Sequence, residues 1–238
     1  MKLYHMPGAC SLADLIVLQW IGADHEPVRM SLESIKSPDY LAINAGGTVP
    51  LLAHGDLTLT ENVAILGYLA DLYPAARLLG DGSPRARAEV MRWLGFLNSD
   101  VHKAFKPIFV PQRFLKDAAM APVLADNARG HVRDYLARLD DQLEGRDWLT
   151  GERSIADPYL FVLSRWSAAK KVDMQGLDNL ARFVRMMDGD AACKPRWTQS
   201  AICRSKLGRH ETFAGRFPPS LRTALRHLGH ARPLVRRT

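Results

Sequence analysis

Cysteine and long apolar runs are both scarce in this sequence, and each scarcity excludes a class of protein. The 238 residues contain three cysteines, an odd and unevenly spaced set that does not make the disulfide framework of a secreted protein. No apolar run approaches the roughly 20 residues that span a bilayer. The N-terminus lacks the basic start and long apolar core of a signal peptide. We therefore expect a protein of the reducing cytoplasm with no membrane segment.

An excess of positive charge is absent from most of the chain and is confined to its C-terminal end. Residues 191–238 carry eleven Lys and Arg against Glu211 alone, whereas the first 190 residues carry 21 basic and 24 acidic side chains. The formal charge of +7 therefore belongs to the tail. It gives no reason to expect that the whole protein binds nucleic acid.

The first 78 residues alternate between strand and helix patterns, as in a small mixed sheet covered by helices. A crossover after the first helix suggests a parallel pair of strands, and His54-Gly55-Asp56 reads as a hairpin turn. The expected strands cover residues 2–5, 27–30, 49–53 and 57–60, and the expected helices cover 11–21, 39–44 and 61–73.

After a linker rich in Pro and Gly, residues 74–84, the pattern becomes wholly helical. We expect one long helix over residues 85–106 that Pro107 stops or kinks. Further helices are expected over 122–143, from 154 onward, and over 177–187. The fold class is thus α/β followed by all-α. Its expected domains are residues 1–78 and 84–190, with an atypical Arg-rich tail over 191–238.

Cys10 stands at the start of the first helix, directly after Pro7-Gly8-Ala9. The helix dipole and the free backbone N–H groups of a first turn favour a thiolate at such a position. Ala13 stands where a resolving cysteine would be expected, so a thiol exchange at Cys10 would need an external thiol. A small, buried and inert cysteine is the alternative, and position alone does not decide between them.

Two further features of the first half are suited to a small peptide ligand. Pro50 opens a strand and cannot donate to its ladder; a cis Val49-Pro50 bond would expose the backbone of Val49 to an extended peptide. Glu61 and Asn62 lie where a strand meets a helix and could receive the amino group and carboxylate of that peptide. The alternatives are an ordinary turn proline and simple helix capping by Thr60.

Five segments carry a combined pattern: MKLYHMPGACSL, GGTVPLL, LTENVAILGYLADLYP, WLGFLNSDVHKAFKP and GERSIADPYLF. Together they resemble a bacterial glutathione S-transferase of the beta class, and the resemblance runs from Met1 to about Met187. It implies a thioredoxin-like glutathione-binding domain followed by an all-helical domain. Two departures are His5 in place of a second tyrosine, and Asn44-Ala45-Gly46-Gly47, which lacks the lysine that the family often has there.

The resemblance also implies roles for particular residues. Cys10 would lie beside the glutathione sulfur, forming a mixed disulfide with it or a hydrogen bond to its thiolate, and Ser11 or His102 is the other candidate partner of that thiolate. The remaining implied contacts are Val49 before cis-Pro50 on the cysteinyl unit, Glu61 and Asn62 on the γ-glutamyl end, Lys36 near the glycyl carboxylate, and Lys103 beside His102 from the helical domain. A solvated loop lysine is the alternative for Lys36, and a structural histidine is the alternative for His102.

The implied activity is conjugation of glutathione, as co-substrate, to small hydrophobic electrophiles. The enzyme would stabilise the thiolate and hold the electrophile against the apolar wall of the helical domain. A homodimer is implied, and no metal. The alternatives are glutathione-dependent thiol-disulfide exchange through Cys10 and a non-catalytic binding protein on the same fold.

Ser154-Ile155-Ala156-Asp157 reads as a structural capping box with Asp in place of Glu. Ser154 would accept from the Asp157 N–H, and the Asp157 carboxylate would reach back to the Ser154 N–H. The helix that follows is apolar on nearly all sides and should be central and buried.

The resemblance stops after Met187, where the family usually ends with a helix of the form VQAALxAE. When residues 192–200 are back-translated with GC-rich codons and read two bases further on, they encode VQAALDAE. We infer a frameshift, genuine or from sequencing, near residues 188–192. A functional Arg-rich extension that binds acidic partners is the alternative.

Resequencing of the gene should therefore find an insertion or deletion near codons 188–192 whose correction restores the VQAALDAE ending. An intact reading frame through those codons would contradict the frameshift and favour a native tail.

Overall fold

The computed structural model describes residues 1–193, in which a four-stranded sheet has the order β2-β1-β3-β4. Its strands are β1 (Lys2–His5), β2 (Glu26–Arg29), β3 (Leu51–His54) and β4 (Leu57–Thr60). β1 pairs with β2 in parallel, which confirms the expected crossover, and β3 is antiparallel to both β1 and β4. β3 begins after Pro50 rather than at Val49, because a proline has no N–H to give to the ladder.

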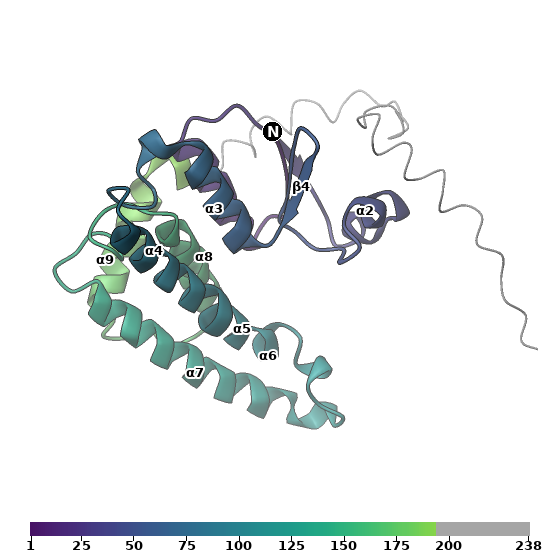
Figure 1. Cartoon of the computed structure of the whole chain (residues 1–238). Helices are drawn as coiled ribbons and strands as arrows, with labels where there is room; N and C mark the ends of the chain where they lie inside the picture. Colours follow the sequence, from purple (N-terminus) through teal and green to yellow (C-terminus); the bar gives the residue numbers. More distant parts are fainter. Residues whose placement is uncertain (194–238) are drawn as a thin grey trace, which may run out of the picture.

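Helices cover both faces of this sheet (Figure 1). On one face lie α1 (Leu12–Trp20) and α3 (Asn62–Leu72), packed on Leu3 and Leu52. On the other lies α2 (Pro38–Ile43), where Tyr40 packs with Tyr4 and Leu51. Because neighbouring strand residues point to opposite faces, each short strand contributes side chains to the packing on both faces of the sheet.

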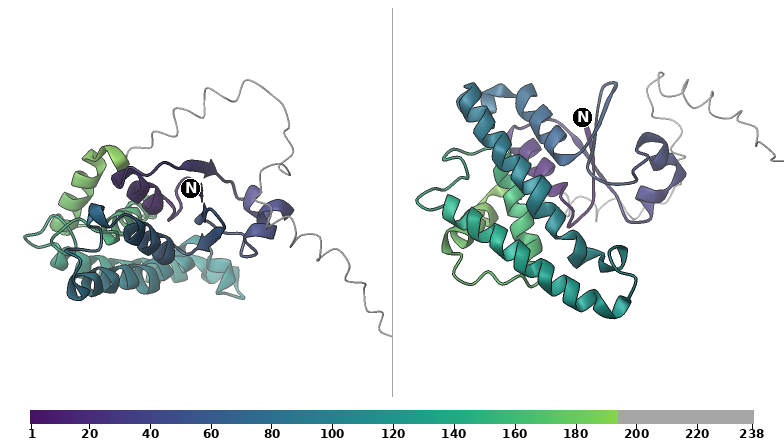
Figure 2. Two further views of the ribbon diagram at one scale, coloured as in Figure 1. Left: turned by 45° about the horizontal axis from the view of Figure 1, so that its top comes forward. Right: turned by 60° about the horizontal axis from the view of Figure 1, so that its bottom comes forward.

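The second half of the described chain is helical and lies on the α1 side of the sheet (Figures 1 and 2). Its helices are α4 (Pro84–Phe96), the π-helix Leu97–Val101, α5 (His102–Ala104), α6 (Lys106–Phe109), α7 (Ala121–Gln142), α8 (Ala156–Ala169) and α9 (Asp178–Gly189). None of the helices among residues 1–193 is long and apolar enough to cross a membrane.

The single long helix expected over residues 85–106 is wrong in one respect. The run passes through the π-helix Leu97–Val101, and α5 ends at Ala104. The interruption expected at Pro107 falls at Phe105, between α5 and α6. Pro107 itself lies in the first turn of α6, where its missing N–H leaves no bond unmade.

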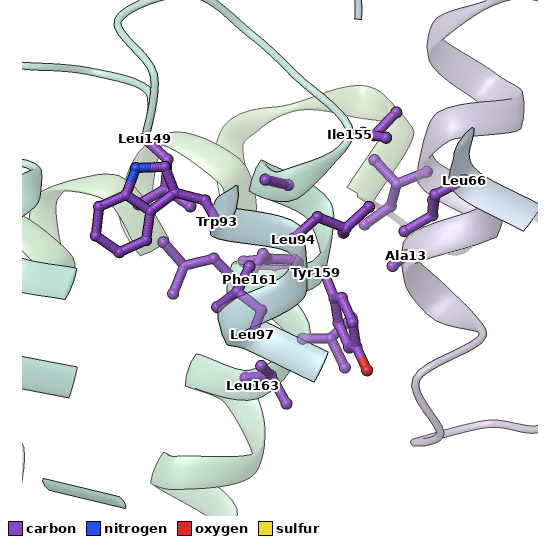
Figure 3. Close-up of a cluster of buried hydrophobic side chains, with 14 of the residues drawn as sticks. Ala13, Leu66, Trp93, Leu94, Leu97, Leu149, Ile155, Tyr159, Phe161 and Leu163 are labelled. Atoms are coloured by element: carbon purple, nitrogen blue, oxygen red, sulfur yellow. The ribbon is translucent and has the colours of Figure 1, made fainter. Parts of the chain in front are cut away.

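One hydrophobic cluster joins the sheet to the helices. Figure 3 shows Ala13 of α1 and Leu66 of α3 facing Leu94, Ile155 and Tyr159 of the helical half. All five are fully buried. The two halves of the described chain therefore share a core, and α1 is packed between them. Residues 194–238, which hold Cys203 and most of the predicted Arg-rich tail, lie outside the described residues.

The capping box at the start of α8 is present, with one difference from the expected pattern. Asp157 accepts hydrogen bonds from the Ser154 N–H at 2.7 Å and the Ser154 hydroxyl at 2.8 Å, and its other oxygen accepts from the Leu149 N–H at 2.9 Å. The Ser154 hydroxyl oxygen accepts from the Ala156 N–H at 3.3 Å, whereas the Asp157 N–H donates to the Ser154 carbonyl. Burial raises the pKa of Asp157 to about 6, although these hydrogen bonds lower it.

We predict that Asp157→Ala destabilises the protein by roughly 3 kcal/mol, because it leaves buried N–H groups unpaired. Asp178→Ala is the matched control. It removes an exposed aspartate from the first turn of α9 and should cost less than about 0.5 kcal/mol. Urea unfolding followed by circular dichroism measures both, and equal costs would contradict the structural role of Asp157.

Candidate active site

Three segments that are distant in the sequence meet at Cys10. The Cys10 thiol faces the Val49 carbonyl, with 3.9 Å between Sγ and O, and the Asn62 side-chain amide donates to the Cys10 carbonyl at 3.3 Å. The Val49-Pro50 bond is cis, as expected. The structure thus brings the cysteine, the backbone before Pro50 and the start of α3 into one site.

The surroundings of Cys10 oppose the thiolate that its place at a helix start favours. Burial raises the pKa of Cys10 to about 12, and the nearby Asp14 and Glu61 carboxylates add to the rise. Hydrogen bonding from backbone N–H groups at the helix start lowers the pKa by less than this. Cys10 is therefore a neutral thiol at physiological pH, able to donate a hydrogen bond.

Ser11 is fully buried, and its hydroxyl is engaged with the backbone of Met6. It accepts from the Met6 N–H at 3.2 Å and lies 3.5 Å from the Met6 carbonyl. These contacts close the loop of residues 6–11, called here the cysteine loop. Ser11 therefore shapes the cysteine loop through its hydroxyl.

Glu61 and Asn62 differ in their surroundings. Glu61 is exposed and has a φ of 72°, a left-handed conformation that is strained for a residue with a side chain and recurs at functional sites. Asn62 is buried, and its Oδ1 has no hydrogen-bond partner, so this oxygen is a candidate to meet a ligand donor. Thr60 ends β4 and does not cap α3, because Glu61 is the residue that precedes the helix.

The two candidate lysines are not brought into contact with Cys10. The Lys36 ammonium donates to the Gly47 carbonyl at 2.9 Å, which ties it to the segment leading to Val49. A Cβ at Gly47 would lie 2.8 Å from the backbone carbonyl oxygen of Ile35 and 2.8 Å from the Lys36 nitrogen, so this position requires glycine. Lys103 is exposed and makes no ion pair or side-chain hydrogen bond with residues 1–193.

His102 lies in the helical half, where it is half-buried against two aromatic rings. Its Nδ1 is 2.5 Å from the hydroxyl of Tyr159, and its ring centre lies 4.9 Å from that of Trp166. The Trp166 indole N–H donates to the Gly8 carbonyl of the cysteine loop at 2.7 Å. Burial lowers the pKa of His102 to about 4, and Lys106 lowers it further, so the imidazole is neutral.

Sequence reasoning missed three residues around this site: Asp14, Tyr159 and Trp166. Tyr159 and Trp166 lie in a nearly apolar helix and gave no polar signal. Asp14 lies four residues after Cys10, is fully buried, and has no partner for either carboxylate oxygen. Burial raises the pKa of Asp14 well above its usual value. No group of His, Cys, Asp or Glu within residues 1–193 is arranged to hold a metal ion.

The family model described as "Glutathione S-transferase, N-terminal domain" matches residues 1–71, which hold the cysteine loop, Val49 and the start of α3. The glutathione S-transferase GST-4.5 of Xanthomonas campestris is 45% identical over 192 residues, which is 80% of this chain and 94% of that protein. This chain belongs to the glutathione S-transferase family.

Solved structures place the chain among the bacterial transferases of that family. A glutathione S-transferase from Xylella fastidiosa is 44% identical with a TM-score of 0.78, covering 85% of this chain and 97% of its own. Two sphingomonad transferases each have a TM-score of 0.71, covering 81% of this chain and 95% of their own chains. One is complexed with glutathione at 38% identity, and the other is a bacterial beta-class enzyme at 37%. The glutathione S-transferase fold expected from the sequence is confirmed.

We predict that, without glutathione, alkylation of Cys10 by iodoacetamide accelerates about tenfold per pH unit from about pH 6 to about pH 10 without levelling off. The reason is that the thiolate is the nucleophile and the thiol stays protonated over this range. Mass spectrometry of the Cys10 peptide measures the rate. Free glutathione in the same tube is the control, and its rate should level off above about pH 8.5. A plateau for Cys10 below about pH 9 would contradict the raised pKa.

Proposed function

We propose that this chain conjugates glutathione to small hydrophobic electrophiles by stabilising the glutathione thiolate. The observation that carries the proposal is the meeting of the Cys10 thiol, the Val49 carbonyl and the start of α3 in one site. Membership of the glutathione S-transferase family supports glutathione as the co-substrate.

Each part of the tripeptide has a suitable partner in this site. The backbone of Val49 before cis-Pro50 pairs with the cysteinyl unit, and the exposed Glu61 carboxylate receives the α-amino group of the γ-glutamyl end. The unpaired Oδ1 of Asn62 adds an acceptor there. Lys36 serves the glycyl carboxylate, exchanging its bond to the Gly47 carbonyl for an ionic one.

The protonation state of Cys10 favours conjugation over thiol-disulfide exchange. A thiol with a pKa near 12 is a poor nucleophile at neutral pH but keeps a proton to donate. A hydrogen bond from Cys10 to the glutathione sulfur favours its charged form and so lowers the pKa of the bound thiol. Cys10 thus acts as a hydrogen-bond donor, and Ser11 and His102 are the further candidates for contact with the sulfur.

The electrophile is assigned to the aromatic surface beside the cysteine loop. Phe105, Phe109 and Trp166 pack together, and Phe109 is 37% exposed. Flat apolar electrophiles stack well on such a surface. Lys103 is exposed, follows His102 in the sequence, and is proposed to attract the glutathione carboxylates.

We further propose two domains over residues 1–78 and 84–190, a homodimer, and residence in the reducing cytoplasm.

The test combines capture on immobilised glutathione with two assays, conjugation of chlorodinitrobenzene and reduction of a mixed disulfide. Cys10→Ala should lower kcat/KM for conjugation by about 10- to 100-fold, because a hydrogen bond to a charged group contributes roughly 1.5–3 kcal/mol. It should also raise the pKa of bound glutathione by about one to two units, measured from the ultraviolet absorbance of the thiolate.

Cys193→Ala is the matched control, because it removes the other thiol among residues 1–193, which lies at the end of the described chain. It should leave conjugation unchanged. Loss of disulfide reduction alone in Cys10→Ala would assign Cys10 to redox exchange instead. Wild-type protein that neither binds nor turns over glutathione would favour the non-catalytic alternative.

A further inference from the structure

The hydroxyl of Tyr159 forms hydrogen bonds with two side chains from another helical segment. Tyr159 lies on α8 and is fully buried, and Figure 3 shows its oxygen at the edge of the hydrophobic cluster. The hydroxyl oxygen is 2.9 Å from Oδ1 of Asn98 and 2.5 Å from Nδ1 of His102. Three polar side chains are therefore linked by hydrogen bonds next to an apolar core, where a donor or acceptor left without a partner would be destabilising.

Asn98 and His102 reach the same hydroxyl because of the local helix geometry. Asn98 lies in the π-helix Leu97–Val101, and His102 begins α5 directly after it. Residues four apart lie on the same face of a helix, so both side chains point to α8. A short π-helical stretch inside an α-helical run is a feature found frequently at functional sites.

Counting protons in this chain of hydrogen bonds fixes the tautomer of His102. A phenol has one proton to donate, and burial raises the pKa of Tyr159, so that proton is retained. The Asn98 carbonyl oxygen can only accept, so the Tyr159 proton goes to it. The Tyr159 oxygen must then accept from Nδ1 of His102, which therefore carries a hydrogen. A neutral imidazole has only one N–H, so Nε2 is left with a lone pair.

The lone pair on Nε2 is available to a ligand. Within residues 1–193, the imidazole of His102 has no hydrogen-bond partner besides Tyr159, and Nε2 is not among the fully buried unpaired atoms. The ring packs on Trp166, whose indole is bonded to Gly8 of the cysteine loop. Nε2 therefore belongs to the part of the helical half that borders the proposed glutathione site.

We propose that Asn98 and Tyr159 are positioning residues that hold His102 in its Nδ1–H tautomer, so that Nε2 accepts the proton of the glutathione thiol. In this step the S–H bond breaks, its electron pair stays on sulfur, and an N–H bond forms at Nε2. The thiolate formed beside the ring raises the pKa of the imidazolium against the lowering by burial and Lys106. The imidazolium keeps its bond to Tyr159 and later returns the proton to water. The role given to Nε2 rests on the proposed function.

The direct test is the tautomer itself, read by NMR of protein labelled with ¹⁵N-histidine and assigned with His102→Gln. The wild type should show the Nδ1–H form. Asn98→Leu removes the acceptor, so the Tyr159 hydroxyl turns to Nδ1 and the tautomer should switch to Nε2–H. Asn98→Asp keeps an acceptor and should retain Nδ1–H. Ser99→Ala, an exposed neighbour in the same π-helix, is the control and should change nothing.

The kinetic test separates positioning from packing. Asn98→Leu and Tyr159→Phe should lower kcat for conjugation about tenfold, less than the roughly 10²–10⁴-fold due to a proton-transferring group itself. KM for glutathione should stay within about twofold, and Asn98→Asp should restore kcat.

An Nε2–H tautomer in the wild type would overturn the proposal without any variant, and so would an unchanged tautomer in folded Asn98→Leu. Wild-type protein that shows Nδ1–H but does not conjugate glutathione would overturn the proposed function and the role of Nε2 with it. The spectrum distinguishes these two failures.

Discussion

The packing of α1 between the sheet and α8 is the contact on which the rest of the structure depends. Its residues 13–18 are all buried, with Leu3 and Leu52 of the sheet on one side and the helical half on the other. The cysteine loop leads directly into α1, so its position follows from that of the helix. Any change that shifts α1 would move Cys10 relative to His102 and Trp166 together.

Burial also sets the charge state of the site. It keeps Cys10 a thiol and His102 an uncharged imidazole, and it raises the pKa of Asp14, because each charged form would lose its hydration. The thiol and the imidazole beside the proposed position of the sulfur are thus neutral. A neutral Cys10 keeps the proton that it can donate to the charge of a bound thiolate.

Local signals were enough to predict most of the fold and several of the site residues. Strands β1 and β4 have the bounds expected from their alternation, and Cys10, Val49 and Asn62 were all marked by turn or capping patterns before they proved to meet. The errors at Thr60 and in the π-helix arose where a tertiary contact overrides local propensity. The alternatives at Cys10 stayed open because the helix start is visible in the sequence whereas the burial that raises the pKa of Cys10 is not.

The links from Tyr159 to His102 and Asn98 could not be predicted for a different reason. They join residues 57 and 61 positions apart, and nothing in the apolar pattern of α8 marks one tyrosine as polar. Such contacts come from how helices pack, which depends on the whole core.

The indole of Trp166 makes two contacts at once. Its ring is part of the aromatic surface proposed for the electrophile, and its N–H donates a hydrogen bond to the Gly8 carbonyl of the cysteine loop. A lineage that acquires new substrates by replacing this tryptophan would also release the loop that holds the thiol. A substitution at this position therefore changes the selectivity for the electrophile and the position of the Cys10 thiol together.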